Sequence, residues 1–317
     1  MIPYILLLIS FVLLAKGADF FIDGASNIAK HFRVSPLFIG LTLAAIGTSA
    51  PEAAVSIKAS IIGVNGIALG NVVGSNIANI CLAIGIAALI KPLFFEDSTI
   101  KKETPFMIFI TILILVFGIN FSQPQNKFIQ ISRIEGIVLL LLFIGFVFYL
   151  SKMAVNDRKN ITSQKSDDNI SIFNNIFFTI IGGAFIVLGG HLAVENAVKI
   201  AEVWNVSEKV IGISVVALGT SIPEIVTSIV AVTKGKISIA IGNIVGSNIF
   251  NILFVLGIAA TISPITLETS IINDMLVCLG ISVLFFIFSK IRNNISKFHG
   301  IIFITFYILY IIFLFSK

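Results

Sequence analysis

The chain has 317 residues, of which 57% are hydrophobic and only 12% charged, and its mean hydropathy is +1.07. Soluble domains contain about 45–50% apolar and about 25% charged residues, so this chain has too few polar side chains to cover a water-soluble particle of its size. The composition excludes a soluble enzyme and predicts a helical membrane protein. The net charge of +5 is informative only through its distribution along the chain.

Ten apolar stretches follow one another along the chain, each close to the length needed to cross a hydrocarbon core of about 30 Å. We expect an all-α polytopic membrane protein with spans at residues 2–29, 36–62, 66–90, 104–119, 134–151, 173–201, 208–233, 237–262, 271–289 and 299–316. No basic segment precedes the first stretch, which is therefore interpreted as a retained span and not as a signal peptide.

The basic residues of the connections are distributed unequally. If the ten spans alternate in direction, fourteen Lys and Arg residues lie on one side and five on the other. Because cytoplasmic loops carry the excess of Lys and Arg, the long connection 152–172 is expected in the cytoplasm and both termini outside. Rich in Ser, Asn and Asp, this connection is interpreted as a flexible hinge between two halves.

The two halves resemble each other at a constant offset of 172 residues. From Ser35 to Glu96, 31 of 62 positions are identical to their counterparts in the second half, without a gap. Each half has five expected spans, an odd number, so the second half must enter the membrane from the opposite side. We therefore expect an inverted repeat, with a first half at 1–151, a hinge loop at 152–172 and a second half at 173–317.

The strongest matches between the halves are polar and lie inside expected spans. The second span contains Gly47-Thr48-Ser49-Ala50-Pro51-Glu52, and the seventh repeats it as Gly219-Thr220-Ser221-Ile222-Pro223-Glu224. Proline has no N–H and crowds the preceding turn, so we expect a broken helix whose carbonyl groups around Ala45 to Thr48 lose their partners. Hydroxyl, carbonyl and carboxylate oxygens then converge on one face of the helix.

A second motif adds more oxygen atoms. The third span contains Gly70-Asn71-Val72-Val73-Gly74-Ser75-Asn76-Ile77-Ala78-Asn79, and the eighth repeats its polar positions from Gly242 to Asn251. Ser75 and Asn79 are four residues apart and share a helix face. Oxygen cages suit hard cations such as Ca²⁺ and Na⁺, whereas a zinc or copper site would use His or Cys, which both motifs lack.

The two motif glutamates have no obvious basic partner. A carboxylate at mid-membrane costs on the order of 3 kcal/mol unless it is compensated. Lys58 is six residues from Glu52, a helical rotation of about 600° that points it elsewhere, and its counterpart is Val230. A mobile cation is the expected compensation. The alternative is that both glutamates are protonated or hydrogen-bonded contacts between helices, and Asn71 and Asn243 could equally cap the broken helices.

Three other acidic residues lie late in the first and sixth spans. We expect Asp19 to pair with Lys16 and Glu195 with Lys199 near the membrane interface, and Asp23 to lie there too, outside the ion pathway. The first and sixth spans are long and lack a proline in their interiors, so they are the candidate sliding elements.

The doubled motifs resemble those of the calcium/cation antiporter superfamily, most closely its prokaryotic sodium/calcium exchanger branch, over nearly the whole chain. The resemblance implies ten helices in two inverted repeats and an antiporter, not an enzyme, that exchanges Na⁺ for Ca²⁺ by alternating access and normally extrudes Ca²⁺. The expected substrates are Ca²⁺ and Na⁺, and the protein is expected to contact membrane lipid. No cofactor, nucleic acid or obligate protein partner is expected. The expected location is the cell membrane.

The resemblance also implies roles for individual residues. Glu52 and Glu224 would be the central carboxylates shared by the Ca²⁺ and Na⁺ sites. Backbone oxygens would come from Thr48, Thr220, Ala45 and Ala217, flanking Na⁺ ligands from Ser49, Ser221, Ser75 and Ser247, and the closing central amides from Asn79 and Asn251. Some exchangers have an aspartate where this chain has Asn251, so a third carboxylate is missing here.

Three other functions remain open at the level of sequence. A Ca²⁺/H⁺ antiporter would use the same two glutamates as proton carriers, although the hydroxyl and amide ligands favour Na⁺. A channel would conduct without coupling two ions. An intramembrane serine protease is disfavoured because the serine is duplicated whereas His191 is not.

Overall fold

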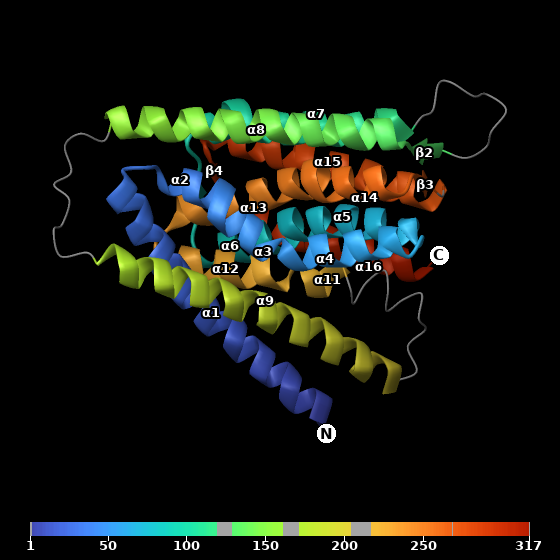
Figure 1. Cartoon of the computed structure of the whole chain (residues 1–317), viewed down its shortest axis with the longest axis horizontal. Coiled ribbons are helices and arrows are strands. Elements are labelled where there is room, and N and C mark those ends of the chain that lie inside the picture. The colour runs from blue at the N-terminus through green and yellow to red at the C-terminus, as the bar shows by residue number, and fades with distance from the viewer. Residues whose placement is uncertain (1, 119–128, 161–170, 204–216, 268, 317) are drawn as a thin grey trace.

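The computed structural model describes residues 2–118, 129–160, 171–203, 217–267 and 269–316 (Figure 1). In the first half, with η marking π-helical segments, the elements are α1 (Ile2–Phe32), α2 (Pro36–Ile39), η1 (Gly40–Ala44), α3 (Ala45–Thr48), α4 (Ala50–Ile61), α5 (Asn65–Ala78), η2 (Asn79–Ile84), α6 (Gly85–Ile90), β1 (Leu93–Phe94), η3 (Thr99–Glu103), α7 (Thr104–Gly118), β2 (Ile129–Ile131) and α8 (Arg133–Asn160). The second half contains α9 (Ile172–Val203), α11 (Ala217–Thr220), α12 (Ile222–Thr233), α13 (Ile237–Phe250), η5 (Asn251–Leu256), α14 (Gly257–Ile262), β3 (Ile265–Leu267), α15 (Thr269–Arg292), β4 (Asn294–Ile295) and α16 (Lys297–Ser316).

Seven helices of the described chain are long and apolar enough to cross a membrane, or eight if the bent pair Pro36–Thr48 and Ala50–Ile61 is one span. Large apolar side chains such as Leu8, Ile134 and Phe173 are two-thirds or more exposed on these helices. Such surfaces suit lipid and not water. Of the other expected spans, α7 has 15 residues, and the seventh is described only from residue 217 onward, as 208–216 lie outside the described residues.

One expectation about the connections needs correction. α8 continues to Asn160, so the part of the expected hinge loop from 152 to 160 is helical; residues 161–170 lie outside the described part of the chain. The all-α fold class is confirmed; within the described connections, four strands of two or three residues form two antiparallel pairs, β1 with β4 and β2 with β3. Each pair joins a connection of one half to a connection of the other.

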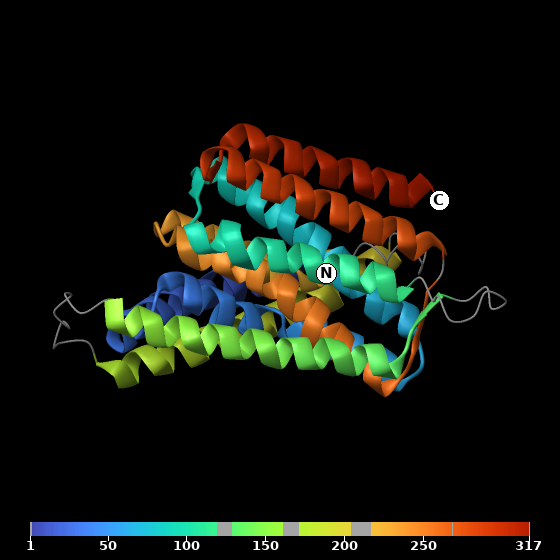
Figure 2. The same ribbon diagram turned by 90° about the horizontal axis from the view of Figure 1, so that it is seen from above.

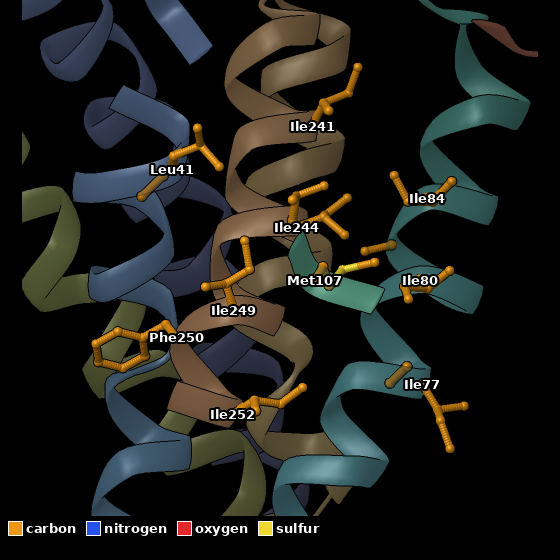
Figure 3. Packing of buried hydrophobic residues seen from close by; sticks show 14 of the residues in the cluster. Leu41, Ile77, Ile80, Ile84, Met107, Ile241, Ile244, Ile249, Phe250 and Ile252 are labelled. Atoms are coloured by element: carbon orange, nitrogen blue, oxygen red, sulfur yellow. The ribbon is translucent and has the colours of Figure 1, made fainter. Parts of the chain in front are cut away.

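The two motif-bearing helix series form the centre of the bundle. In the most apolar window of the series from 237 to 262, 83% of residues are buried, and in that from 66 to 90 the share is 72%, against 17–33% in the other long spans. Figure 3 shows Ile244 and Ile252 of the α13–η5 series facing a space also approached by Ile80 of η2, with Met107 of α7 between them. The two copies of the second motif are therefore held in the most buried of these long spans.

α1 and α9 lie side by side along one edge of the bundle (Figures 1 and 2). Their contact is close because small residues face each other. A Cβ atom built on Gly17 would lie 2.8 Å from Gly182 O, and one on Gly182 would lie 2.6 Å from Gly17 O. Small residues that let backbones approach are typical of tightly packed membrane helices. The two expected sliding helices thus pack against each other.

An ion pair connects α1 to the turn after α12. Lys234 Nζ lies 2.6 Å from Asp19 Oδ1 and 2.7 Å from Asp23 Oδ2, so the expected pairing of Asp19 with Lys16 is wrong. Partial burial lowers the pKa of Lys234, but hydrogen bonds and the charges of both aspartates outweigh it and raise the pKa overall. The expected pair of Glu195 with Lys199 is confirmed at 2.6 Å.

Gly63 and Gly235 end the two short motif helices α4 and α12. Their φ angles are +81° and +73°, which a side chain would disfavour. Val64 N then donates to Ala59 O, and Lys236 N donates to Ala231 O, a pattern that satisfies the last carbonyl groups of a helix. The tight turn returns the chain directly into α5 or α13, beside the helix that carries the glutamate.

The contact between η1 and α13 depends on two glycines. A Cβ atom on Gly242 would lie 2.7 Å from Leu37 O and 2.9 Å from Gly40 Cα. We expect Gly242→Ala to lower the free energy of unfolding by about 1–3 kcal/mol, because the two central backbones would be forced apart. Heating in detergent, followed by size-exclusion chromatography of the surviving protein, measures the loss.

Gly145→Ala in α8 is the matched control, since no described atom lies within 4 Å of a Cβ built there. This variant should be neutral or slightly stabilising, because alanine is the better helix former. Equal losses in the two variants would contradict the close packing of η1 on α13.

Candidate functional site

Both motif helices are broken next to their glutamates. Ser49, with φ −84° and ψ 8°, separates α3 from α4, and the axes on the two sides of this break differ by 48°. Ser221, with φ −83° and ψ −5°, separates α11 from α12 in the same way. Each proline lies in the first turn of the following helix, where its missing N–H costs nothing. The break places Glu52 and Glu224 in the first turns of α4 and α12.

One of the carbonyl groups expected to lose its hydrogen bond at the break keeps it. Ser49 N donates to Ala45 O at 3.1 Å, so the expectation that the Ala45 carbonyl loses its helical hydrogen bond is wrong. The same oxygen also lies 3.4 Å from Ser247 Oγ, which can donate to it. The Ala45 oxygen therefore faces the second half, although it is not unsatisfied. The corresponding Ala217 is the first residue of α11, and its side chain lies outside the described ones.

Glu224 is fully buried and receives hydrogen bonds from both motifs. Ser49 Oγ donates to its Oε1 at 2.8 Å, and Ser247 Oγ lies 3.4 Å from the same atom. Within the described part of the chain, Oε2 has no hydrogen-bond partner. One carboxylate oxygen is thus held by hydroxyl groups, and the other is available to a ligand.

Glu52 is also fully buried, and the hydroxyl groups of Ser75 and Thr220 face its carboxylate. Neither carboxylate oxygen has a hydrogen-bond partner among the described residues. The ion pairs of the described residues include neither Glu52 nor Glu224. The two carboxylates are also close enough to repel each other electrostatically. Two like charges without a cation are unstable in such a place.

A reciprocal set of hydrogen bonds surrounds the glutamates. Thr48 Oγ1 lies 3.1 Å from Asn243 Oδ1, and Thr220 Oγ1 lies 3.1 Å from Asn71 Oδ1. Asn71 Nδ2 donates to Ser56 Oγ and to Glu52 O, and Asn243 Nδ2 donates to Ser228 Oγ. These asparagines connect the broken helices α4 and α12 to the neighbouring α5 and α13. The expected capping is not observed, because Ser49 and Ser221 occupy the N-cap positions of α4 and α12 and the amide groups of Asn71 and Asn243 donate to atoms further along these helices.

Four asparagines join the ends of α5 and α13. Asn79 Nδ2 donates to Asn248 Oδ1 at 3.1 Å, and Asn251 Nδ2 donates to Asn76 Oδ1 at 3.1 Å. The π-helical segments η2 and η5 begin at Asn79 and Asn251. Sequence reasoning assigned no role to Asn76 and Asn248, although their presence in both copies of the motif was a signal that could have found them.

The structure therefore brings most of the predicted site residues into one buried cluster. Contacts across the halves connect Glu52, Glu224, Thr48, Thr220, Ser49, Ser75 and Ser247. Ser221 lies at the second break, and Asn79 and Asn251 lie one turn beyond Ser75 and Ser247. No group of three or more His, Cys, Asp or Glu side chains occurs in the described ranges, so an ion here would have two carboxylates and otherwise neutral oxygens.

The chain matches the family described as sodium/calcium exchanger protein over residues 2–152 and 174–316. The chain belongs to this family. It is 35% identical to the sodium/calcium exchanger MaX1 of Methanosarcina acetivorans, over 99% of both chains. It is 36% identical to the putative antiporter CaxA of Alkalimonas amylolytica, over 83% of this chain and 82% of that one. The fold matches the sodium-calcium exchanger NCX_Mj soaked with Na⁺ and Sr²⁺, with a TM-score of 0.84 and 33% identity over 98% of each chain.

Membership of the sodium/calcium exchanger family confirms the resemblance found in the sequence. The family consists of secondary transporters of Na⁺ and Ca²⁺, not of enzymes. The chain is accordingly an integral membrane cation exchanger, which agrees with its lipid-compatible surface.

The asparagine braces give a test of the site's symmetry. Asn71→Leu and Asn243→Leu should each lower the free energy of unfolding by about 1–3 kcal/mol, because buried hydroxyl groups lose their partners. Thermal denaturation in detergent measures both. Thr111→Val is the control, since Thr111 Oγ1 bonds only Met107 O one turn earlier in its own helix. A large loss in one asparagine variant and none in the other would contradict the reciprocal arrangement.

Proposed function

We propose that this exchanger takes up Na⁺ and extrudes Ca²⁺ across the cell membrane by alternating access. The observation that carries the proposal is the pair of fully buried glutamates, Glu52 and Glu224. Each faces a hydroxyl group of the opposite half, and neither has a cationic partner among the described residues. A bound cation would compensate both charges at once. Two carboxylates neutralise one Ca²⁺ or are shared by two or three Na⁺ ions.

The ligands proposed for Ca²⁺ combine the two carboxylates with neutral oxygen atoms. Glu52 and Glu224 provide the charged oxygens, Thr48 and Thr220 provide mainly backbone oxygens, and Asn79 and Asn251 complete the centre with neutral amides. Ca²⁺ takes six to eight oxygen ligands and tolerates irregular geometry, which such a mixed set can satisfy. The positions of both glutamates in the first turn of a helix support the assignment, because the helix dipole favours negative charge there.

The proposed Na⁺ sites flank this centre. Their ligands are the hydroxyl groups of Ser49, Ser221, Ser75 and Ser247, the carbonyl groups of Ala45 and Ala217, and the shared glutamates. The contact of Ser247 Oγ with both Glu224 Oε1 and Ala45 O supports the grouping, since each of these two oxygens lies 3.4 Å from the hydroxyl group. Na⁺ and Ca²⁺ would compete for the same carboxylates, which makes binding of the two ions mutually exclusive.

The proposed architecture has ten spans in two inverted halves, 1–151 and 173–317, joined by the segment 152–172. Two observations support it. The family match is divided into the ranges 2–152 and 174–316, and α5, η2 and α6 recur 172 residues later as α13, η5 and α14 with the same boundaries. The bias of basic residues supports a cytoplasmic 152–172 segment and outer termini.

Alternating access is proposed to come from α1 and α9 moving together past the buried centre. Their close glycine-mediated contact supports movement as a unit. If three Na⁺ exchange for one Ca²⁺, one net charge crosses the membrane in each cycle, and the membrane potential contributes about 2.3 kcal/mol per 100 mV to export. The ion pair of Lys234 with Asp19 and Asp23 is one contact that such a movement must break or keep.

The driving ion is tested with proteoliposomes that are loaded with a defined cation and diluted into a buffer containing radiolabelled Ca²⁺. An outward Na⁺ gradient should drive Ca²⁺ uptake, whereas H⁺ or K⁺ gradients should not, because serine hydroxyls beside the carboxylates serve Na⁺ and not protons. Uptake driven by H⁺ alone would instead establish a Ca²⁺/H⁺ antiporter. Ca²⁺ flux that persists without any counter-ion would establish a channel.

The two glutamates are tested by Glu52→Gln and Glu224→Gln, which preserve shape and remove charge. Each should reduce Na⁺-driven Ca²⁺ uptake at least about 100-fold, because the one remaining carboxylate cannot neutralise a divalent cation. Glu195→Gln is the matched control, since Glu195 is partly exposed and bonded to Lys199 on its own helix. Full uptake by both site variants would end the assignment.

A further inference from the structure

Asn76 and Asn248 form the observation that the ion ligands leave unexplained. Both are buried, with 2% and 1% of their surface exposed, and they occupy matching positions in the two copies of the motif. Each hydrogen-bonds across the halves to one of the two asparagines proposed to close the ion site. An asparagine amide has an acceptor end and a donor end of nearly equal shape, so its orientation decides whether it attracts or repels a cation.

The orientation of the Asn251 amide can be traced from a backbone group. Asn76 Nδ2 donates to Asn248 O at 3.2 Å, and a carbonyl oxygen can only accept. This bond fixes which end of the Asn76 amide carries the oxygen. Asn76 Oδ1 then accepts from Asn251 Nδ2 at 3.1 Å, so the nitrogen of Asn251 is committed to this contact.

The Asn79 amide is oriented by the corresponding bond of the other half. Asn79 Nδ2 donates to Asn248 Oδ1 at 3.1 Å. Asn248 Nδ2 in turn lies 3.6 Å from Met107 Sδ, a weak acceptor, where the first chain of bonds has a carbonyl group. Figure 3 shows Met107 beside the α13 series. The residue 172 positions later is Leu279, so this contact has no counterpart in the second half.

Both chains of bonds leave the same atoms over. Asn79 and Asn251 are fully buried, and among the described residues their Oδ1 atoms have no hydrogen-bond partner. Asn79 lies one turn beyond Ser75, which faces the Glu52 carboxylate, and Asn251 lies one turn beyond Ser247, which contacts Glu224. An unsatisfied amide oxygen in this place is costly unless a ligand uses it.

We propose that Asn76 and Asn248 are positioning residues that hold the amides of Asn251 and Asn79 with their oxygen atoms available to the transported cation. The proposal rests on the proposed function, since it assigns a role toward the same ion. Without these partners each amide is free to rotate and present its N–H groups, which repel a cation. The four neutral asparagines thereby offer two fixed oxygen ligands without adding a third charge.

The test compares Asn248→Leu and Asn76→Leu in Na⁺-driven uptake of radiolabelled Ca²⁺. Each variant should raise KM for Ca²⁺ about tenfold or more, with a smaller change in maximal rate. Met107→Leu should raise KM by about two- to threefold, since it removes only the weak acceptor behind Asn248. Ser282→Ala is the control, because the buried Ser282 Oγ donates only to Cys278 O among the described residues, within α15; its KM should be unchanged.

A rescue experiment separates positioning from general packing. An aspartate has two acceptor oxygens and no N–H group, so its orientation needs no partner. In an Asn79→Asp background, Asn248→Leu should change KM less than about threefold, while Asn76→Leu should still raise it. In an Asn251→Asp background the pattern should reverse. The proposal would be overturned if either aspartate rescued both leucine variants equally. It would also be overturned if neither single leucine variant raised KM.

The outcome for the glutamates distinguishes the two hypotheses. If Glu52→Gln and Glu224→Gln abolish uptake but both leucine variants keep the wild-type KM, the positioning role fails and the ion site stands. If the glutamine variants transport fully, the ion site itself fails. If a leucine variant does not fold, Met107→Leu and Asn248→Asp test the positioning role in its place. Asn248→Asp retains the acceptor for Asn79, so a KM above the wild-type value would contradict the proposal.

Discussion

The structure depends on the burial of two like charges in one place. Glu52 and Glu224 are both excluded from solvent and repel each other, and no described lysine or arginine approaches them. The fold supplies partial compensation through hydroxyl groups and the first turns of two helices. It does not supply a full positive charge. Under the proposed function a cation compensates the remaining deficit, at two carboxylates that are both fully buried.

The sequence was sufficient to predict features that repeat or that follow from local chemistry. The doubled motif placed the helix breaks correctly beside Glu52 and Glu224, because proline acts on its own turn in any context. The boundaries of the span at 237–262 also agreed, since Lys236 and Ser263 flank a largely apolar segment. The cross-half contacts required only that matching residues of the two halves meet.

Features that depend on partners distant in the sequence could not be predicted in this way. Lys16 was the nearest candidate for Asp19 along its own helix, but the folded chain brings Lys234 closer. The end of α8 was misplaced because its last turns are polar and contact other segments, as when Arg158 Nε donates to Phe32 O. Asn76 and Asn248 are present in both copies of the motif, yet their role depends on which end of each amide faces which neighbour, and the sequence does not contain this information.

The exchange of ligands between the halves has a consequence for how such a protein could arise. Ser49 of the first half serves the carboxylate of the second, and Thr220 of the second half faces the carboxylate of the first. Neither half alone therefore provides all of the oxygen atoms that surround its own glutamate. If the two halves are inverted as proposed, an unduplicated precursor would have assembled the same ligands only by pairing with a second copy of itself inserted in the opposite orientation.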